Sequence, residues 1–172
     1  MSSEEKEVVL AIDPGYDRCG VAFMTKRGEK PTVLFSTCVT SQKKDEHPKR
    51  VQSIFDAVKN LIQAYQPNIL ALETLFFSVN KSTAMRVAEV RGALFALAGI
   101  YDLPVREVSP QAIKLALTGS GNASKAQVEK MVTLTVELPK TKRLDDEIDA
   151  IALGVTALEL LRVEKRKKAL AK

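Results

Sequence analysis

The sequence predicts one α/β domain: a mixed sheet of five strands with helices on both faces. Strand-like and helical segments follow in the order three strands, helix, strand, helix, strand and then helices, which is typical of this class. Two of the strand-like segments, Val8–Ile12 and Ile69–Glu73, are almost wholly apolar, as expected of strands covered on both faces. A chain of 172 residues can bury one core, which we assign to residues 1–163, ahead of a basic tail at 164–172.

The first three strands are predicted to be antiparallel neighbours. Val8–Ile12 stops at the turn sequence Asp13-Pro14-Gly15, and Gly20–Thr25 is its expected hairpin partner. Gly28 marks the next turn, and Thr32–Thr40 supplies a third strand rich in β-branched residues.

Helices are predicted where apolar residues recur at intervals of three and four. One such pattern begins at Val51 and ends at Tyr65, just before a proline. A longer one, from about Asn80 to Ile100, carries more apolar surface than one helix face needs. Pro104–Val108 is the next expected strand.

Capping residues predict two short helices after that strand. Ser109, followed by a proline, is typical of a helix start, and Gly119 is the expected stop. Ser124 and Gln127 have the spacing of a capping box ahead of a helix that runs to about Val136.

The chain is basic, above all at its end. Its formal net charge is +5 at pH 7, with an isoelectric point near 9.2, and this favours a polyanionic partner such as nucleic acid. A last helix is expected from about Asp145 to Val163, followed by a tail, Glu164–Lys172, that we expect to fray.

Neither export nor membrane insertion is predicted. The first seven residues are polar, and no apolar run approaches the ~20 residues needed to span a bilayer. Cys19 and Cys38 have no spacing typical of a metal or disulfide framework, which suits a reducing compartment. We therefore expect a cytoplasmic protein.

Four acidic residues stand where carboxylates need an explanation. Asp13 and Glu73 end two apolar strands, and Asp149 precedes a nearly continuous apolar run. Asp146 lies three residues before Asp149, so both side chains project from one face of the last helix. Simpler interpretations exist, because Asp-Pro-Gly is common in turns and acids are favoured at helix N-termini.

If the four acids converge, they form a site for hard divalent cations. Carboxylate oxygens suit Mg²⁺ or Mn²⁺, and two such ions about 4 Å apart can activate water and stabilise the leaving oxygen in phosphodiester cleavage. A zinc site is not expected, since His47 is the only histidine. The chemistry predicted from these residues is hydrolysis of a phosphodiester.

The same residues resemble the RuvC family of Holliday-junction resolvases. The resemblance extends to about Leu161. No single marker is specific for the family, but the order and spacing of the markers are specific. The markers are Ile12-Asp13-Pro14-Gly15, Glu73-Thr74-Leu75-Phe76 with Asn80 following, Arg91-Gly92, the Gly121–Val128 segment and Asp146-Glu147-Ile148-Asp149-Ala150. Departures are Tyr16-Asp17-Arg18-Cys19 after the first acid, and Glu147-Ile148 where small residues are usual.

The resemblance implies a ribonuclease H-like fold and a homodimer that cuts symmetric four-way DNA junctions with two Mg²⁺ per site, Mn²⁺ being an expected substitute. It makes Asp13, Glu73, Asp146 and Asp149 both the metal ligands and, with Lys125, the catalytic residues. A branch-migration complex is a possible partner. The DNA contacts that we predict are Phe76, Asn80, Lys81, Arg91, Lys114 and Lys125.

Physical reasoning supports part of this assignment. Phe76 follows the strand that ends at Glu73, so it is placed to stack on an unpaired base. Lys125 occupies the first turn of a helix, where acids are preferred, and this favours a role facing phosphate. Lys81, Arg86 and Arg91 could follow a second DNA arm, although a solvated helix face explains them equally well.

Three other functions share some of these features. The chain could bind junctions without cutting them, which a metal-dependent nicking assay would decide. Asp-Pro-Gly also resembles the phosphate loop of actin-like ATPases and sugar kinases, but those need a duplicated domain. A related nuclease that trims RNA would prefer structured RNA to junction DNA.

Overall fold

Five strands form one mixed sheet in the order β3-β2-β1-β4-β5. The computed structural model describes residues 7–28, 30–75, 81–136, 138 and 143–171, without the side chains of residues 81 and 82. The strands are β1 (Val9–Asp13), β2 (Arg18–Arg27), β3 (Lys30–Thr40), β4 (Ile69–Glu73) and β5 (Val105–Val108). β1, β2 and β3 are antiparallel neighbours, whereas β4 and β5 continue the sheet from β1 in parallel. The predicted fold class is confirmed.

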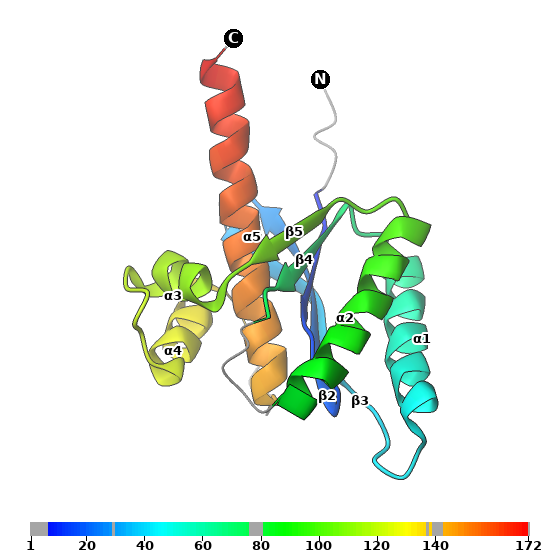
Figure 1. Ribbon diagram of the computed structural model, residues 1–172. Coiled ribbons are helices and arrows are strands. Elements are labelled where there is room, and N and C mark those ends of the chain that lie inside the picture. Colours follow the sequence, from blue (N-terminus) through cyan, green and yellow to red (C-terminus); the bar gives the residue numbers. More distant parts are fainter. Residues whose placement is uncertain (1–6, 29, 76–80, 137, 139–142, 172) are drawn as a thin grey trace.

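Helices cover both faces of the sheet (Figure 1). Leu10 and Ile12 of β1 point to the face covered by α1 (His47–Tyr65) and α2 (Lys81–Ile100). Val9 and Ala11 alternate with them and point to the face covered by the three other helices. Those helices are α3 (Pro110–Thr118), α4 (Lys125–Thr135) and α5 (Asp145–Leu170).

The predicted helix caps are present. The Ser109 side chain accepts a hydrogen bond from the backbone N–H of Ala112, and Gly119 ends α3 in the left-handed conformation, at φ 76°. Ser124 and Gln127 form the reciprocal capping box at the start of α4. Local chemistry therefore determines where these helices begin and end.

The basic tail differs from the expectation. Helix α5 does not fray at Glu164 but continues to Leu170, and it extends beyond the body of the domain (Figure 1). Two long-range ion pairs hold this part: Arg106 to Glu164 at 2.6 Å and Lys165 to Glu7 at 3.0 Å. Among the described helices, none is both long and apolar enough to cross a bilayer.

Both cysteines are free thiols. Cys19 is fully buried in the core, and burial raises its pKa to about 12. A thiol that stays protonated is a poor nucleophile and a poor metal ligand.

Helix α5 packs against β2 with almost no space between them. A Cβ atom on Gly20 would lie 1.8 Å from the carbonyl oxygen of Asp146, and one on Gly154 would lie 2.4 Å from Cγ of Met24. The first of these neighbours is backbone, which cannot rotate away. Gly20 therefore sets how closely the start of α5 approaches the sheet.

We expect Gly20→Ala to force the start of α5 away from β2 and to lower the free energy of unfolding by about 2 kcal/mol, or the melting temperature by roughly 5 °C. The exposed α2 residue Gly99 is the matched control, because its Cβ would meet nothing within 4 Å. Gly99→Ala should be neutral or slightly stabilising. Equal effects of the two changes in thermal denaturation would contradict this account.

Candidate active site

The four predicted acids lie at one end of the sheet. Asp13 and Glu73 end the adjacent parallel strands β1 and β4, whose last paired residues are Ile12 and Leu72. Asp13 is paired with Gly20 across β1 and β2, and Gly20 contacts the Asp146 backbone at the start of α5. The fold thus brings residues more than 130 positions apart to the same edge.

Two cations hold the acids that α5 contributes. The Nε atom of Arg18 lies 3.0 Å from Oδ2 of Asp146. The Nζ atom of Lys125 lies 2.9 Å from Oδ2 of Asp149 and 3.5 Å from Oδ2 of Asp145. With the acids held this way, no three Asp, Glu, His or Cys side chains of the described residues are grouped as ligands of one ion.

One carboxylate oxygen nevertheless lacks a directed partner. Oδ2 of Asp146 is buried and accepts no hydrogen bond from the described residues. The 3.0 Å approach of Arg18 is therefore an ion pair without hydrogen-bond geometry. A buried carboxylate oxygen without a hydrogen-bond donor, in an acid whose charge acts on Asp13, fits a hard cation such as Mg²⁺.

Burial raises the pKa of both strand-borne acids to about 7. For Asp13 the ordinary value is 3.8, and after burial the charges of Glu73, Asp149 and Asp146 raise its pKa further, while Lys125 opposes them. For Glu73 the ordinary value is 4.5, and the charge of Asp149 adds to the effect of burial. These carboxyls lie close enough to repel one another, which is the electrostatic signature of a shared site.

A cavity of about 260 Å³ opens beside these acids. Its polar lining comes from Glu73, Asp149, Lys114 and Lys125, and the rest of its wall is apolar. Two predicted lysines thus share a cavity with two predicted acids. Burial by itself lowers the pKa of Lys125, but its hydrogen bond to Asp149 and the nearby acidic charges outweigh this and raise it. Lys125 remains a cation in the site.

Comparison with known proteins identifies the family. A family model described as "Crossover junction endodeoxyribonuclease RuvC" matches residues 9–157. The chain belongs to this family. RuvC from Petrotoga mobilis is 38% identical over 145 residues, which cover 84% of this chain and 89% of that protein. RuvC from Natranaerobius thermophilus is 34% identical over 159 residues, 92% of this chain and 99% of that protein.

A solved RuvC structure agrees with this assignment. The structure described as "T. thermophilus RuvC in complex with Holliday junction substrate" matches with a TM-score of 0.86 and 28% identity. The match covers 92% of this chain and 96% of that one. The resemblance to the RuvC family and the ribonuclease H-like fold that it implies are both confirmed.

The position of Arg91 corrects a prediction. It was expected on the DNA-binding surface, yet it is only 6% exposed. Its guanidinium donates to the backbone carbonyl of Glu73 and pairs with the carboxylate of Glu107 on β5. A buried guanidinium with these partners is not available to phosphate. Arg91 instead fixes the end of β4 and so positions the Glu73 carboxylate.

Three other predicted DNA contacts are not tested by the structure. Phe76 and Asn80 lie outside the described residues. For Lys81 only the backbone, at the start of α2, is described. Their roles stay predictions.

Glu147, whose role the sequence left open, has structural partners. Its Oε1 atom accepts a hydrogen bond of 2.6 Å from the Ser36 hydroxyl on β3, and its side chain is only 14% exposed. Glu147 therefore ties α5 to the sheet and is not a fifth acid of the site.

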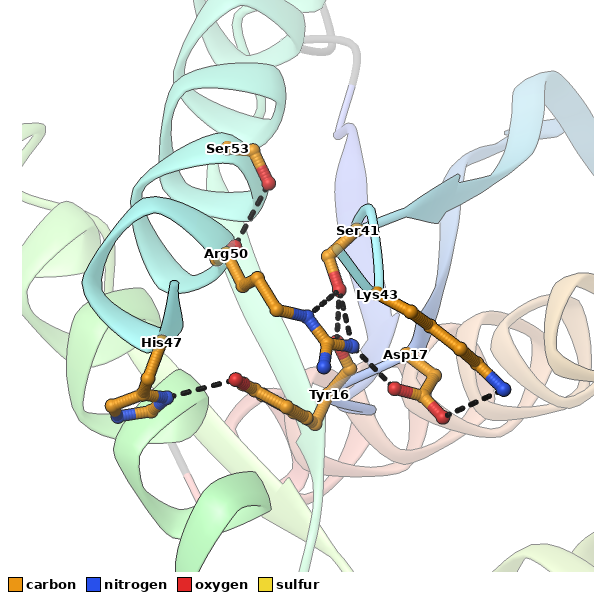
Figure 2. A network of polar contacts seen from close by, with 7 residues as sticks. All are labelled: Tyr16, Asp17, Ser41, Lys43, His47, Arg50 and Ser53. Atoms are coloured by element: carbon orange, nitrogen blue, oxygen red, sulfur yellow. Dashed lines mark hydrogen bonds and ion pairs between the residues drawn. The ribbon is translucent and has the colours of Figure 1, made fainter. Parts of the chain in front are cut away.

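The sequence did not predict the residues that hold the loop between β1 and β2. Arg50 of α1 donates to the Ser41 hydroxyl and to Asp17, and its guanidinium lies 3.8 Å from the centre of the Tyr16 ring (Figure 2). The only signal was the departure at Tyr16-Asp17-Arg18 from the family pattern, which did not indicate partners on another helix.

The raised pKa values predict how stability depends on pH in the absence of divalent cations. Because Asp13 and Glu73 have higher pKa values in the folded than in the unfolded chain, the folded chain holds protons that the unfolded chain releases. Their contribution to stability is complete below about pH 4 and is lost as the pH rises to about 7. Asp13→Asn should therefore stabilise the metal-free protein relative to wild type, increasingly from pH 4 to pH 7.

Urea denaturation in EDTA at several pH values measures this difference. Asp56→Asn, at an exposed position on α1, is the control and should show no comparable increase with pH. An Asp13→Asn advantage that stays constant with pH, or is absent at pH 7, would show that the carboxyl is not buried against like charges.

Proposed function

We propose that this protein resolves four-way DNA junctions by paired symmetric nicks, through Mg²⁺-dependent hydrolysis of one phosphodiester per site. The observation that carries the proposal is the grouping of Asp13, Glu73, Asp146 and Asp149 at one edge of the sheet, with two lysines beside them. Membership of the RuvC family and the likeness to a junction-bound RuvC give the substrate.

The four acids would hold the metal, as two Mg²⁺ ions per site, with Mn²⁺ as a substitute. Bound there, the cations supply an activated water and charge stabilisation at the leaving oxygen. Asp13 and Glu73 stand on adjacent rigid strands, which limits their movement. The carboxylates of Asp146 and Asp149, which now pair with Arg18 and Lys125, would serve the cations as ligands.

Lys125 and Lys114 act on the phosphate. Both line the cavity that also contains Glu73 and Asp149, so a phosphodiester that reaches the acids lies between cationic side chains. With Asp149 serving as a metal ligand, the Lys125 ammonium group that now donates to it would be available to stabilise negative charge that develops on the phosphate.

The protein would act as a homodimer, since two symmetric cuts need two sites related by a twofold axis. Helix α2 packs on the core through Val90, Leu94 and Leu97 but also exposes large apolar side chains. Met85 is 66% exposed and Phe95 38%. A helix that is apolar beyond its core face is a candidate dimer surface. Action in the cytoplasm and a branch-migration partner stay predictions.

Removing the acids should separate cutting from binding. Asp13→Asn and Glu73→Gln are expected to abolish Mg²⁺-dependent nicking of a synthetic four-way junction, because each removes a ligand charge, while junction affinity stays within a few-fold of wild type. Gel assays with Mg²⁺, Mn²⁺ or EDTA measure both properties, and Asp56→Asn is the control. Near-normal cutting by either variant would rule out the assignment, and binding without cutting by the wild-type chain would favour the non-catalytic alternative.

Lys125→Ala should lower kcat by about 10²- to 10³-fold with a small change in KM, as expected when a group that stabilises transition-state charge is lost. Lys130, exposed further along the same helix, is the matched control, and Lys130→Ala should leave kcat unchanged. Single-turnover cleavage measures the effect. Equal rates for the two variants would limit Lys125 to an ion pair with Asp149.

A charge on the exposed face of α2 should break the dimer. Met85→Glu is expected to sediment as a monomer and to nick one strand at a time, so that paired cuts disappear while single nicks continue. Leu170→Glu, at a position that is 88% exposed near the end of α5, should stay dimeric. A dimeric Met85→Glu chain with normal paired cutting would place the interface elsewhere.

A further inference from the structure

A second hollow has one of the four acids, Asp146, in its lining. This groove, of about 610 Å³, lies between the loop joining β1 to β2 and the first turns of α2. Asp146 forms part of its wall, whereas Asp149, three residues later on α5, lines the first cavity. Each hollow therefore has at least one acid of the candidate active site in its lining, and the proposed mechanism uses only the first hollow.

Two arginines, Arg18 and Arg86, are the basic residues that line the groove. The side chains of Arg18 and Arg86 are 49% and 45% exposed, one from each wall. Thr83, also in the lining, adds an exposed hydroxyl. Exposed guanidinium groups on facing walls are suited to an anion with several oxygens.

The acids that line the groove are already paired. Asp17 binds Arg50 and lies 4.0 Å from Lys43, so its charge is balanced from outside the groove. Asp146 is an acid of the candidate metal site. Arg18 has Asp146 as its counter-ion, and Arg86 has Glu89 at 3.6 Å. A phosphate could replace Asp146 as the partner of Arg18 and Glu89 as the partner of Arg86.

The loop wall is held rigidly. Ser41 donates from its hydroxyl to the Tyr16 carbonyl at 2.6 Å, and from its backbone N–H to the Asp17 carbonyl at 3.1 Å. The Arg50 guanidinium, only 8% exposed as a residue, binds the same Ser41 hydroxyl and Asp17 (Figure 2). Arg18 follows this anchored segment directly, so its backbone position is fixed.

Tyr16 connects the two walls. Its ring lies 3.8 Å from the Arg50 guanidinium and 5.7 Å from that of Arg86. Its hydroxyl is 2.9 Å from Nδ1 of His47, whose Nε2 is 2.9 Å from Glu89 of α2 (Figure 2 for the first contact). Glu89 in turn pairs with Arg86. The spacing of the two arginines is therefore built into the fold.

We propose that this groove binds a backbone phosphate of the strand that is cut, next to the scissile phosphate, with Arg18 and Arg86 as its ligands. The occupant is the sugar-phosphate backbone because Asp146, an acid of the candidate active site, lines the groove, and because both arginines of the lining are about half-exposed. A strand that crosses the acids from the lysine-lined cavity enters this groove next. The inference rests on the proposed nuclease function, since that function places a strand there.

The test pairs a protein change with a change in the DNA. A junction is made with one uncharged methylphosphonate in place of each phosphate near the cut in turn, and affinity is measured with the Asp13→Asn chain, which is expected to bind without cutting. Adding Arg86→Ala should weaken binding to the unmodified junction about tenfold and reduce the slope of log Kd against log salt by about one. When the methylphosphonate replaces the phosphate that Arg86 contacts, Arg86→Ala should cause no further loss of affinity.

Arg27 provides the control, because it is an exposed arginine at the opposite end of β2 from Arg18. Arg27→Ala should leave affinity and salt slope unchanged, and Arg86→Lys, which keeps the charge, should recover most of the lost affinity. An Arg86→Ala loss that is the same at every modified position, or no loss at all, overturns the groove proposal. Failure of the wild-type chain to cut the unmodified junction with Mg²⁺ overturns the nuclease function instead. The groove proposal is judged separately, by the affinities of the Arg86→Ala chain for the modified junctions, which do not depend on cutting.

Discussion

The close contact of α5 with β1 and β2 is the constraint on which the site depends. Only a glycine at position 20 lets the first turn of α5 approach the sheet edge where Asp13 ends β1. Ile151 and Leu153, both fully buried, hold that helix on the sheet. Their burial, worth about 1.5–3 kcal/mol each, offsets the repulsion between carboxylates that the same packing brings together. The apolar core thus stabilises an arrangement of charges that would otherwise separate.

Cations of the chain itself relieve part of that repulsion. Lys125 pairs with Asp149, and Arg18 pairs with Asp146. Arg91 donates a hydrogen bond to the backbone carbonyl of Glu73. The strand acids have no comparable ion pair among the described residues, and burial, together with the neighbouring negative charges, raises their pKa values. The two pairs of acids therefore differ: those on the helix have protein cations beside them, and those on the strands keep protons or need a metal.

Much of the architecture could be predicted from the sequence because it depends on local patterns. Ser124 and Gln127 lie within one turn of the helix they cap, and Ile69–Glu73 is bounded by its own composition. The acids could be predicted because a carboxylate at the end of an apolar strand needs a reason. The burial of Arg91 could not be predicted, because it depends on an ion pair with Glu107, which lies on a strand later in the chain. The tail looked frayed because its stabilising partners, Glu7 and Arg106, are distant in sequence.

The acids come from opposite ends of the polypeptide: Asp13 from the first strand and Asp146 from the last helix. During synthesis, the early strands and α1 can form while the sheet face that α5 covers is still bare. A nascent or truncated chain that stops before residue 145 has half of the carboxylates and an exposed apolar surface. If the four acids act as proposed, such a fragment cannot cut DNA, and synthesis must pass the start of α5 before the chain becomes a nuclease.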